Sequence, residues 1–476
     1  MGILNPPASG VTVRMYRVGL GDCFLLAFPT GQAGQAFYML IDCGGIFDTE
    51  NPEQKMMDVA SDIAAATGGH IHLLVITHEH WDHLSGFIQA SDVFKSMQIH
   101  NLWLAWTEDS SNPLAQRLRT AFHDNREILR MVVEDASDSM DTDVILIMKL
   151  LHFFEPSIRP GHAKGSTATV DTGTALEAVR GFNASLQYCH PGDALSLPSD
   201  NGAPDVPGMR IYVLGPPHNE QKLKDINPAA KGQKVYTQGS APTAQSANQS
   251  ASDDDPSYPF DQHLMIPLTE AKQYEFFQTY YSFDLAWRRL DDNRWLEAAE
   301  DFALQLDSFT NNTSLALAIE LVNTKKMLLF VSDAHIGNWL SWDDLSWSVP
   351  GATGAVQTIR VEDLLARTVL YKVGHHGSVN ATLGANGQEK KGLELMIHPD
   401  LVAMLPVDHE MAATNKWNVP FDPLLQRLQE KTSQRVMRTD DPFPKPQPDG
   451  MSDAAWQTFK ANFEETPLYM QYTVTD

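Results

Sequence analysis

Short apolar runs that stop at turns or at polar residues recur along the whole chain. Alternating apolar and polar positions over residues 11–18 predict a strand, and the runs 23–28 and 37–41 predict two more. Glycine-containing turns join these runs as hairpin-like connections, which favours antiparallel pairing at a sheet edge. Two strands are predicted within residues 186–215, and the others cover residues 72–76, 102–106, 315–321, 327–331, 368–373, 401–405 and 435–438. With helices predicted between many of these strands, the sequence indicates an α/β protein.

A helical period replaces this pattern in two long stretches. Residues 114–151 repeat their apolar positions at helical spacing, and residues 269–306 carry an aromatic helical face. Because a minimal sandwich does not need them, we interpret both as insertions. The first covers residues 107–175. The second covers residues 219–310 and includes a low-complexity segment at 236–256, which we expect to be mobile.

Potential metal ligands are most concentrated directly after the predicted strand 72–76. His78, His80, Asp82 and His83 fall within six positions. A divalent metal would hold such a group together, and zinc suits His and Asp ligands, with manganese or iron as alternatives. His78 and His80 are two positions apart and can share one ion, whereas Asp82 and His83 enter a helix and point toward a second. The competing interpretation, a solvated helix start near Asp82, fits a group of four ligand-type residues poorly.

Other predicted strands also stop at residues that can bind a metal. His218, Asp333 and His375 each follow such a strand. Ligands at the ends of neighbouring strands would converge at one sheet edge, where rigid elements hold them well. Asp22 and Asp42 lie beside glycines next to strands, and for both a turn aspartate is the competing interpretation.

Charge and composition narrow the class of protein. The chain has a formal net charge of −25, which repels long phosphate backbones and argues against a general nucleic-acid binder. No apolar run has the length of a membrane span, and residues 1–10 lack the pattern of a signal peptide. The three cysteines have no disulfide-rich spacing. We therefore expect a cytoplasmic globular protein that does not enter a membrane.

The order of these residues resembles a known family. Residues 77–83 resemble the H-x-H-x-D-H motif of the metallo-β-lactamase superfamily, and His218, Asp333 and His375 follow in the ligand order of that superfamily. Further stretches resemble the hydrolase domain of ComEC, the bacterial DNA-uptake channel: residues 18–22 and 40–44, 312–315 and 330–334, the K-V-x-H-H-G-S-like residues 372–378, and residues 420–428 and 438–440.

This resemblance spans residues 11–440 apart from the insertions. It implies one metallo-β-lactamase αββα sandwich over residues 1–476 with helical insertions and with one or two metals at the sheet edge. The chain departs from the ComEC pattern at His218, where that family usually has prolines and often no histidine. It also lacks an accompanying membrane-spanning region, so the resemblance indicates a free-standing relative.

We expect two divalent ions, with zinc the first choice. The expected ligands of the first ion are His78, His80 and His218, those of the second are Asp82, His83 and His375, and Asp333 is expected to bridge both ions. A water between the metals would have its pKa lowered and act as the nucleophile.

Further residues of the predicted site surround these ligands. We assign catalytic roles to Asp82 and His376, and His376 could exchange roles with His375 as a ligand. Ser378, His409 and Lys372 are candidates for contacting the substrate, although a structural role fits the strand position of Lys372 better.

Three functions remain open from the sequence. The first is a dinuclear phosphodiesterase or nuclease, acting on a small phosphodiester or a short single-stranded nucleic acid. The second is a hydrolase of a lactone, lactam or thioester, which the acidic charge does not oppose. The third is a binding protein that keeps the fold without turnover, and the complete ligand set argues against it.

Overall fold

The computed structural model confirms a mixed α/β architecture. It describes residues 2–32, 34–46, 49–135, 142–155, 171–225, 273–274, 294–350, 355–384, 390–443 and 447–475. The predicted low-complexity segment 236–256 and most of the predicted helical stretch 269–306 lie outside these ranges.

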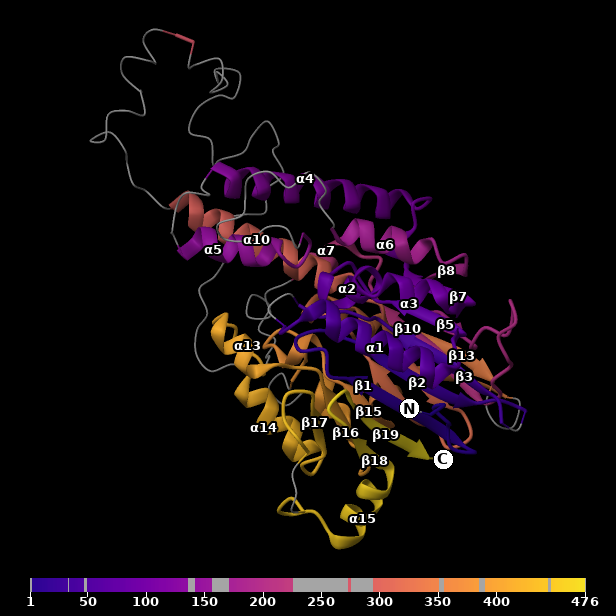
Figure 1. Cartoon of the computed structure of the whole chain (residues 1–476). Coiled ribbons are helices and arrows are strands. Elements are labelled where there is room, and N and C mark those ends of the chain that lie inside the picture. Colours follow the sequence, from indigo (N-terminus) through magenta and orange to yellow (C-terminus); the bar gives the residue numbers. More distant parts are fainter. Residues whose placement is uncertain are drawn as a thin grey trace.

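The first sheet has eight strands in the order β18-β19-β1-β2-β3-β5-β7-β8. The expected hairpins are present, since β1, β2 and β3 pair antiparallel, and β3, β5, β7 and β8 then continue the sheet in parallel. The C-terminal strand β19 pairs with β1, so both ends of the described chain share this sheet (Figure 1). The strands are β1 (Gly10–Tyr16), β2 (Phe24–Pro29), β3 (Ala36–Ile41), β5 (Leu73–Ile76), β7 (Asn101–Ala105), β8 (Ser185–Cys189), β18 (Phe463–Glu465) and β19 (Tyr469–Thr475).

The second sheet has seven strands in the order β17-β16-β15-β12-β11-β10-β9. Strands β10, β11 and β12 form an antiparallel meander, and β12, β15, β16 and β17 run parallel. The strands are β9 (Ala194–Leu195), β10 (Met209–Gly215), β11 (Ala316–Leu321), β12 (Lys326–Phe330), β15 (Thr368–Lys372), β16 (Val402–Leu405) and β17 (Val436–Arg438).

Apolar side chains from the facing sides of the two sheets form the central core. Phe24 of β2 and Phe330 of β12, for example, pack edge to face with ring centroids 5.6 Å apart. Helices cover both outer faces, because each sheet also packs a second apolar cluster against helices. The helices on the first sheet are α1 (Pro52–Thr67), α2 (Trp81–Gln89), α3 (Ser91–Ser96) and α6 (Thr172–Arg180). Those on the second are α11 (Ile336–Ser341), α12 (Val361–Ala366), α13 (His409–Thr414) and α14 (Asp422–Lys431).

Three helices from the two predicted insertions pack together beyond the sandwich. They are α4 (Pro113–Asp135), α5 (Thr142–Leu151) and α10 (Arg294–Asn312), and each contacts the other two (Figure 1). Within the predicted helical stretch 114–151, the described residues are helical as α4 and α5, and α10 extends beyond residue 306 to Asn312. Among the described helices, none combines the length and apolar character needed to cross a membrane.

Smaller elements complete the described chain. The helix expected to start at Asp82 and His83 begins at Trp81, and Ala90 separates it from the next helix, α3. The sequence pattern did not predict α1, α6, α11, α12, α13, α15 (Asp453–Asn462), β13 (Ser346–Pro350), β14 (Val356–Arg360), β18 or β19. The elements not yet given are β4 (His70–Ile71), β6 (Gln98–Ile99), α7 (Glu220–Leu223) and the 3-10 turns Trp106–Glu108, Trp342–Asp344, His375–Gly377 and Gly392–Leu395.

Candidate metal centre

The motif after β5 forms a buried cluster. The chain leaves the sheet after Ile76 and enters α2 at Trp81. His78 and His80 therefore lie in the connection, and Asp82 and His83 lie in the first turn of the helix. All four side chains are buried. Because a buried carboxylate and three imidazoles are costly to desolvate, their accumulation needs compensating partners.

Asp333 and His376 from the second sheet approach this motif. Asp333 Oδ2 lies 3.2 Å from His83 Nε2, and His376 Nε2 lies 3.2 Å from Asp82 Oδ2. Among the described residues, three groups each bring three potential ligand atoms within 4.8 Å of one another. Two of them include Asp333, namely His78, His83 and Asp333, and Asp82, Asp333 and His376, and the third is Asp22, Asp42 and His83. Since Asp333 belongs to two of these groups and has two oxygens, it could contact two ions at once.

Several buried polar atoms in this cluster have no hydrogen-bond partner among the described residues. They are His80 Nε2, Asp82 Oδ1, His83 Nε2, Asp333 Oδ2 and His335 Nδ1. Buried polar groups in folded proteins are normally paired, so this concentration requires an explanation. Imidazole and carboxylate donors with free lone pairs are the ligands that Zn²⁺, Mn²⁺ and Fe²⁺ take in proteins. The residues present therefore fit a divalent metal centre.

A second layer of hydrogen bonds fixes the imidazole rings. His83 Nδ1 donates to Asp42 Oδ2 at 2.8 Å, which turns Nε2 toward Asp333. His376 Nδ1 donates to the Pro406 carbonyl at 2.9 Å, which leaves Nε2 toward Asp82. Such outer hydrogen bonds are typical of metal-ligating histidines, because they fix both the tautomer and the orientation of the ring.

Lys372 lies beneath the cluster rather than on its surface. Its side chain is buried, and Nζ donates to the Ser332 carbonyl at 2.9 Å and to Asp333 Oδ1 at 3.2 Å. It also forms an ion pair with Asp22. These contacts favour the structural role of Lys372 over substrate contact, and they give Asp22 a function beyond that of a turn residue.

His335, which the sequence analysis did not single out, lies at the edge of the cluster. It precedes α11, is buried, and its Nε2 lies 2.8 Å from His375 Nδ1. The same His375 nitrogen lies 3.0 Å from Ser378 Oγ. Both His375 and Ser378 are half-buried, whereas His376 is buried. The ring of His376 therefore faces the carboxylates, and His375 lies nearer the surface with Ser378.

The two insertions form one wall of the cluster. Phe154, which follows α5, packs on His80 with ring centroids 4.8 Å apart, and the Phe153 carbonyl accepts a hydrogen bond from the Trp81 backbone N–H. From α10, Asp307 Oδ1 lies 3.7 Å from His80 Nε2. Burial, together with the nearby carboxylates Asp82 and Asp333, raises the pKa of Asp307 to about 8. A bound cation would relieve this crowding of carboxylates.

Burial keeps four histidines of the cluster neutral. It lowers the pKa of His80 to about 3 and that of His375 to about 4, and it holds the pKa values of His78 and His335 well below 6.5. These rings are neutral at pH 7 and offer the lone pairs that a metal requires.

For His83 and Asp333, neighbouring charges outweigh burial, so that their pKa values shift toward the charged forms. Burial alone would lower the pKa of His83, but Asp333, Asp82 and Asp42 outweigh it and hold that pKa well above 6.5. Burial would likewise raise the pKa of Asp333, but His83 and Lys372 keep it well below 3.8. Without a metal, this cluster of carboxylates therefore retains His83 as an imidazolium beside the Lys372 ammonium, and, against the effect of burial, the hydrogen bond to Asp82 and the charge of Asp333 also raise the pKa of His376.

Two predicted site residues lie apart from the cluster in the contacts that the structure describes. His218 is exposed, stacks on Trp106 with centroids 4.5 Å apart, and has its Nε2 3.3 Å from His190 Nδ1. His409 is exposed at the start of α13, where its Nδ1 donates to the Val419 carbonyl. His335, by contrast, contacts His375 at the edge of the cluster.

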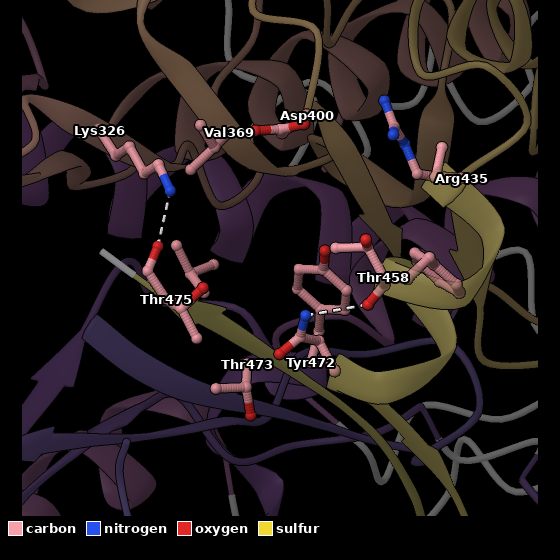
Figure 2. A pocket seen from close by; sticks show the side chains of 12 residues that line it. Lys326, Val369, Asp400, Arg435, Thr458, Tyr472, Thr473 and Thr475 are labelled. Carbon is pink, nitrogen blue, oxygen red and sulfur yellow. Dashed lines mark hydrogen bonds between the residues drawn. The ribbon is translucent and has the colours of Figure 1, made fainter. Parts of the chain in front are cut away.

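A separate cavity of about 140 Å³ lies at the other ends of the parallel strands. Figure 2 shows Lys326 and Val369, at the starts of β12 and β15, among its lining residues, with Arg435 and Asp400 nearby. Its cations are already engaged by backbone carbonyls, since Lys326 Nζ donates to Thr475 and Arg435 donates to Leu401. None of the predicted site residues lines this cavity.

Comparison with known proteins adds no assignment. No protein-family model matches the chain, and no curated protein matches it in sequence.

Proposed function

We propose that this chain is a metal-dependent hydrolase of the metallo-β-lactamase type that binds two divalent ions, zinc most readily, and cleaves small phosphodiesters. The observation that carries the proposal is the pair of buried ligand sets that share Asp333. Buried atoms without partners among the described residues support a metal at each set: His83 Nε2 and Asp333 Oδ2 in the first, Asp82 Oδ1 and Asp333 Oδ2 in the second. The layer order and the ComEC-like motifs support the choice of family.

A dinuclear centre, when loaded, supplies Lewis acidity and a water of lowered pKa. The residues of the chain would hold and orient that centre. Asp333 would contact both ions, while Lys372 keeps the Asp333 carboxylate charged through the 3.2 Å contact. Asp82, which has one oxygen without a partner among the described residues, would accept a proton from a water at the centre. His376 Nε2 would hold the same ion as the other Asp82 oxygen, because the Pro406 carbonyl already occupies its Nδ1.

The rim residues suggest how a substrate would be held. His375 and Ser378 are half-buried and linked at 3.0 Å, so they lie where a phosphoryl oxygen could accept a hydrogen bond. The deeper residues are almost inaccessible, and the insertion residues Phe153 and Phe154 flank His80. Together with the net charge of −25, this enclosure favours small or single-stranded phosphodiesters over long duplexes.

The test is metal analysis combined with a substrate panel. Protein loaded with zinc or manganese is assayed on bis-p-nitrophenyl phosphate, single-stranded DNA, RNA, a lactone and nitrocefin. We expect two ions per chain and hydrolysis of the small phosphodiester. Asp333→Asn serves as the inactive control, because it removes the charge that both ions would share while keeping the side-chain shape.

Three outcomes would overturn parts of this proposal. Efficient cleavage of the lactone or nitrocefin with every phosphodiester untouched would make this a carboxylic-substrate hydrolase. Two bound ions without turnover on any substrate of this panel would favour a binding protein on the same fold. Failure of the pure protein to bind a divalent ion would reject the metal centre itself.

A further inference from the structure

One ring nitrogen of His78 and one of His80 lie within hydrogen-bond distance of each other. His78 Nε2 lies 3.0 Å from His80 Nδ1, and the ring planes cross at 69°. Two nitrogens bound to one tetrahedral zinc at about 2.0–2.1 Å are roughly 3.3 Å apart. This spacing suits joint ligation of one ion. Nδ1 is then the ligand atom of His80, and Nε2 points away from the ion.

The nitrogen that points away meets a carboxylate from the second insertion. His80 Nε2 is buried without a hydrogen-bond partner among the described residues, and Asp307 Oδ1 lies 3.7 Å from it. This separation is about 0.7 Å longer than a typical hydrogen bond, a gap that a small side-chain rotation closes. Asn311 donates to the other Asp307 oxygen at 3.2 Å and holds the carboxylate on α10.

A second histidine of the centre has the same arrangement, and there the hydrogen bond to the carboxylate is formed. Asp42 accepts a hydrogen bond from His83 Nδ1 while His83 Nε2 faces Asp333. In both pairs a carboxylate lies behind a ring whose other nitrogen faces the cluster. A carboxylate in this position fixes the tautomer and makes the ligating nitrogen more basic.

We propose that Asp307 is a positioning residue of the metal centre: it accepts a hydrogen bond from His80 Nε2–H and so directs the His80 Nδ1 lone pair to the ion shared with His78. This inference rests on the metal binding of the proposed function, but it does not depend on the reaction. It makes the second insertion part of the centre, because α10 supplies the carboxylate.

The test measures metal affinity in Asp307→Ala, Asp307→Asn and Asp307→Glu proteins. Zinc binding is measured by competition with a chromophoric chelator, and the Co²⁺-substituted proteins are compared by their visible absorption, which reports the ligand field. We expect Asp307→Ala to bind one of the two ions 10- to 100-fold more weakly, as for other outer-sphere partners. The visible Co²⁺ bands of that site should shift, and Asp307→Glu should restore part of the affinity.

Asp58→Asn is the matched control, because Asp58 is an exposed aspartate on α1. If Asp307→Ala fails to fold, Asp307→Val decides the question, because valine fills most of the space of the side chain and accepts no hydrogen bond, whereas Asp307→Asn keeps an acceptor and tests only the charge. Wild-type affinity and an unchanged Co²⁺ spectrum in the folded Asp307 variant would overturn the inference while leaving a two-metal wild type intact. Absence of metal binding in the wild-type protein would reject this inference and the proposed function together.

Discussion

Asp42 accepts a hydrogen bond from His83 across 2.8 Å, although the two residues are 41 positions apart and lie on different elements. The same carboxylate accepts two more hydrogen bonds, from the Thr77 backbone N–H at 2.9 Å and from Thr77 Oγ1 at 2.6 Å. Asp42 therefore joins the end of β3 to the end of β5 and orients His83 at once. A turn aspartate would need none of these contacts.

Substitution of Asp42 should therefore affect both stability and metal binding. Asp42→Asn tolerates the positive φ of 53° at this position and keeps an acceptor, but it loses the charge that faces His83. We expect zinc affinity to fall 10- to 100-fold, and the free energy of unfolding without metal to fall by about 1–3 kcal/mol as a buried donor loses its charged acceptor. Chelator competition and urea unfolding measure the two effects. Unchanged affinity would mean that His83 needs no fixed orientation.

The adjacent histidines His375 and His376 should have separable roles. His376 is held between the Pro406 carbonyl and Asp82, whereas His375 is half-buried beside Ser378 and His335. We expect His376→Ala to lose one ion per chain and essentially all turnover. His375→Ala should keep both ions and lose turnover by 10²- to 10⁴-fold, the usual range for a group that transfers or holds a proton. Elemental analysis paired with kinetics distinguishes the two, and the reverse pattern would make His375 the ligand.

The sequence predicted the parts of this site in which neighbouring residues act together. His78, His80, Asp82 and His83 follow a strand directly, and their density alone indicated a metal. Asp333 was recognisable for the same reason, as a ligand-type residue at a strand end. The apolar runs likewise predicted most strands of both sheets, since buried strands in a sandwich are read from short stretches.

Other parts depend on contacts that no local pattern encodes. Asp307 lies 227 positions from His80 on a helix that the sequence marked only as an insertion. His335 follows Asp333 by two positions, and only the packing of α11 brings its ring to His375. The pairing of β19 with β1 joins opposite ends of the chain, so no short-range signal could predict it. A ligand-type residue two positions from Asp333 was the one available signal for His335.

Protonation of His83 should give the metal-free protein a specific pH dependence. Because the folded pKa of His83 is raised above its unfolded value of 6.5, its contribution to stability is complete below pH 6.5 and is lost as the pH rises through the folded pKa. Asp82 and Asp333 have lowered pKa values, so their contributions are present above pH 4 and do not change in this window. The melting temperature without metal should therefore fall above pH 6.5 by more in the wild type than in His83→Asn.

Metal binding should respond to pH in the opposite direction. A zinc ion requires neutral His83, so binding must displace its proton, and affinity should rise by up to tenfold per pH unit while His83 remains protonated in the metal-free protein. Calorimetry at pH 7 in buffers of different ionisation enthalpy would show the released proton. If the zinc affinities of wild type and His83→Asn have the same pH slope and no proton is released, His83 is not protonated in the metal-free protein.

His218 and His335 provide a direct test of where the ligand set ends. The ligand order of the wider metallo-β-lactamase superfamily pointed to His218, yet that ring is exposed on Trp106 and its described partner is His190. His335 is buried, neutral at pH 7 and adjacent to His375, and its Nδ1 has no partner within the described residues.

We therefore expect His218→Ala to retain two ions, wild-type zinc affinity and near-wild-type turnover, because an exposed side chain is removed. His335→Ala should weaken zinc binding at least tenfold and lower turnover, because a buried nitrogen beside the centre is lost. Both variants are measured by elemental analysis and chelator competition, with circular dichroism to confirm that each is folded. Loss of an ion in His218→Ala but not in His335→Ala would restore His218 as a ligand and would require its loop to move toward His78 when metal binds.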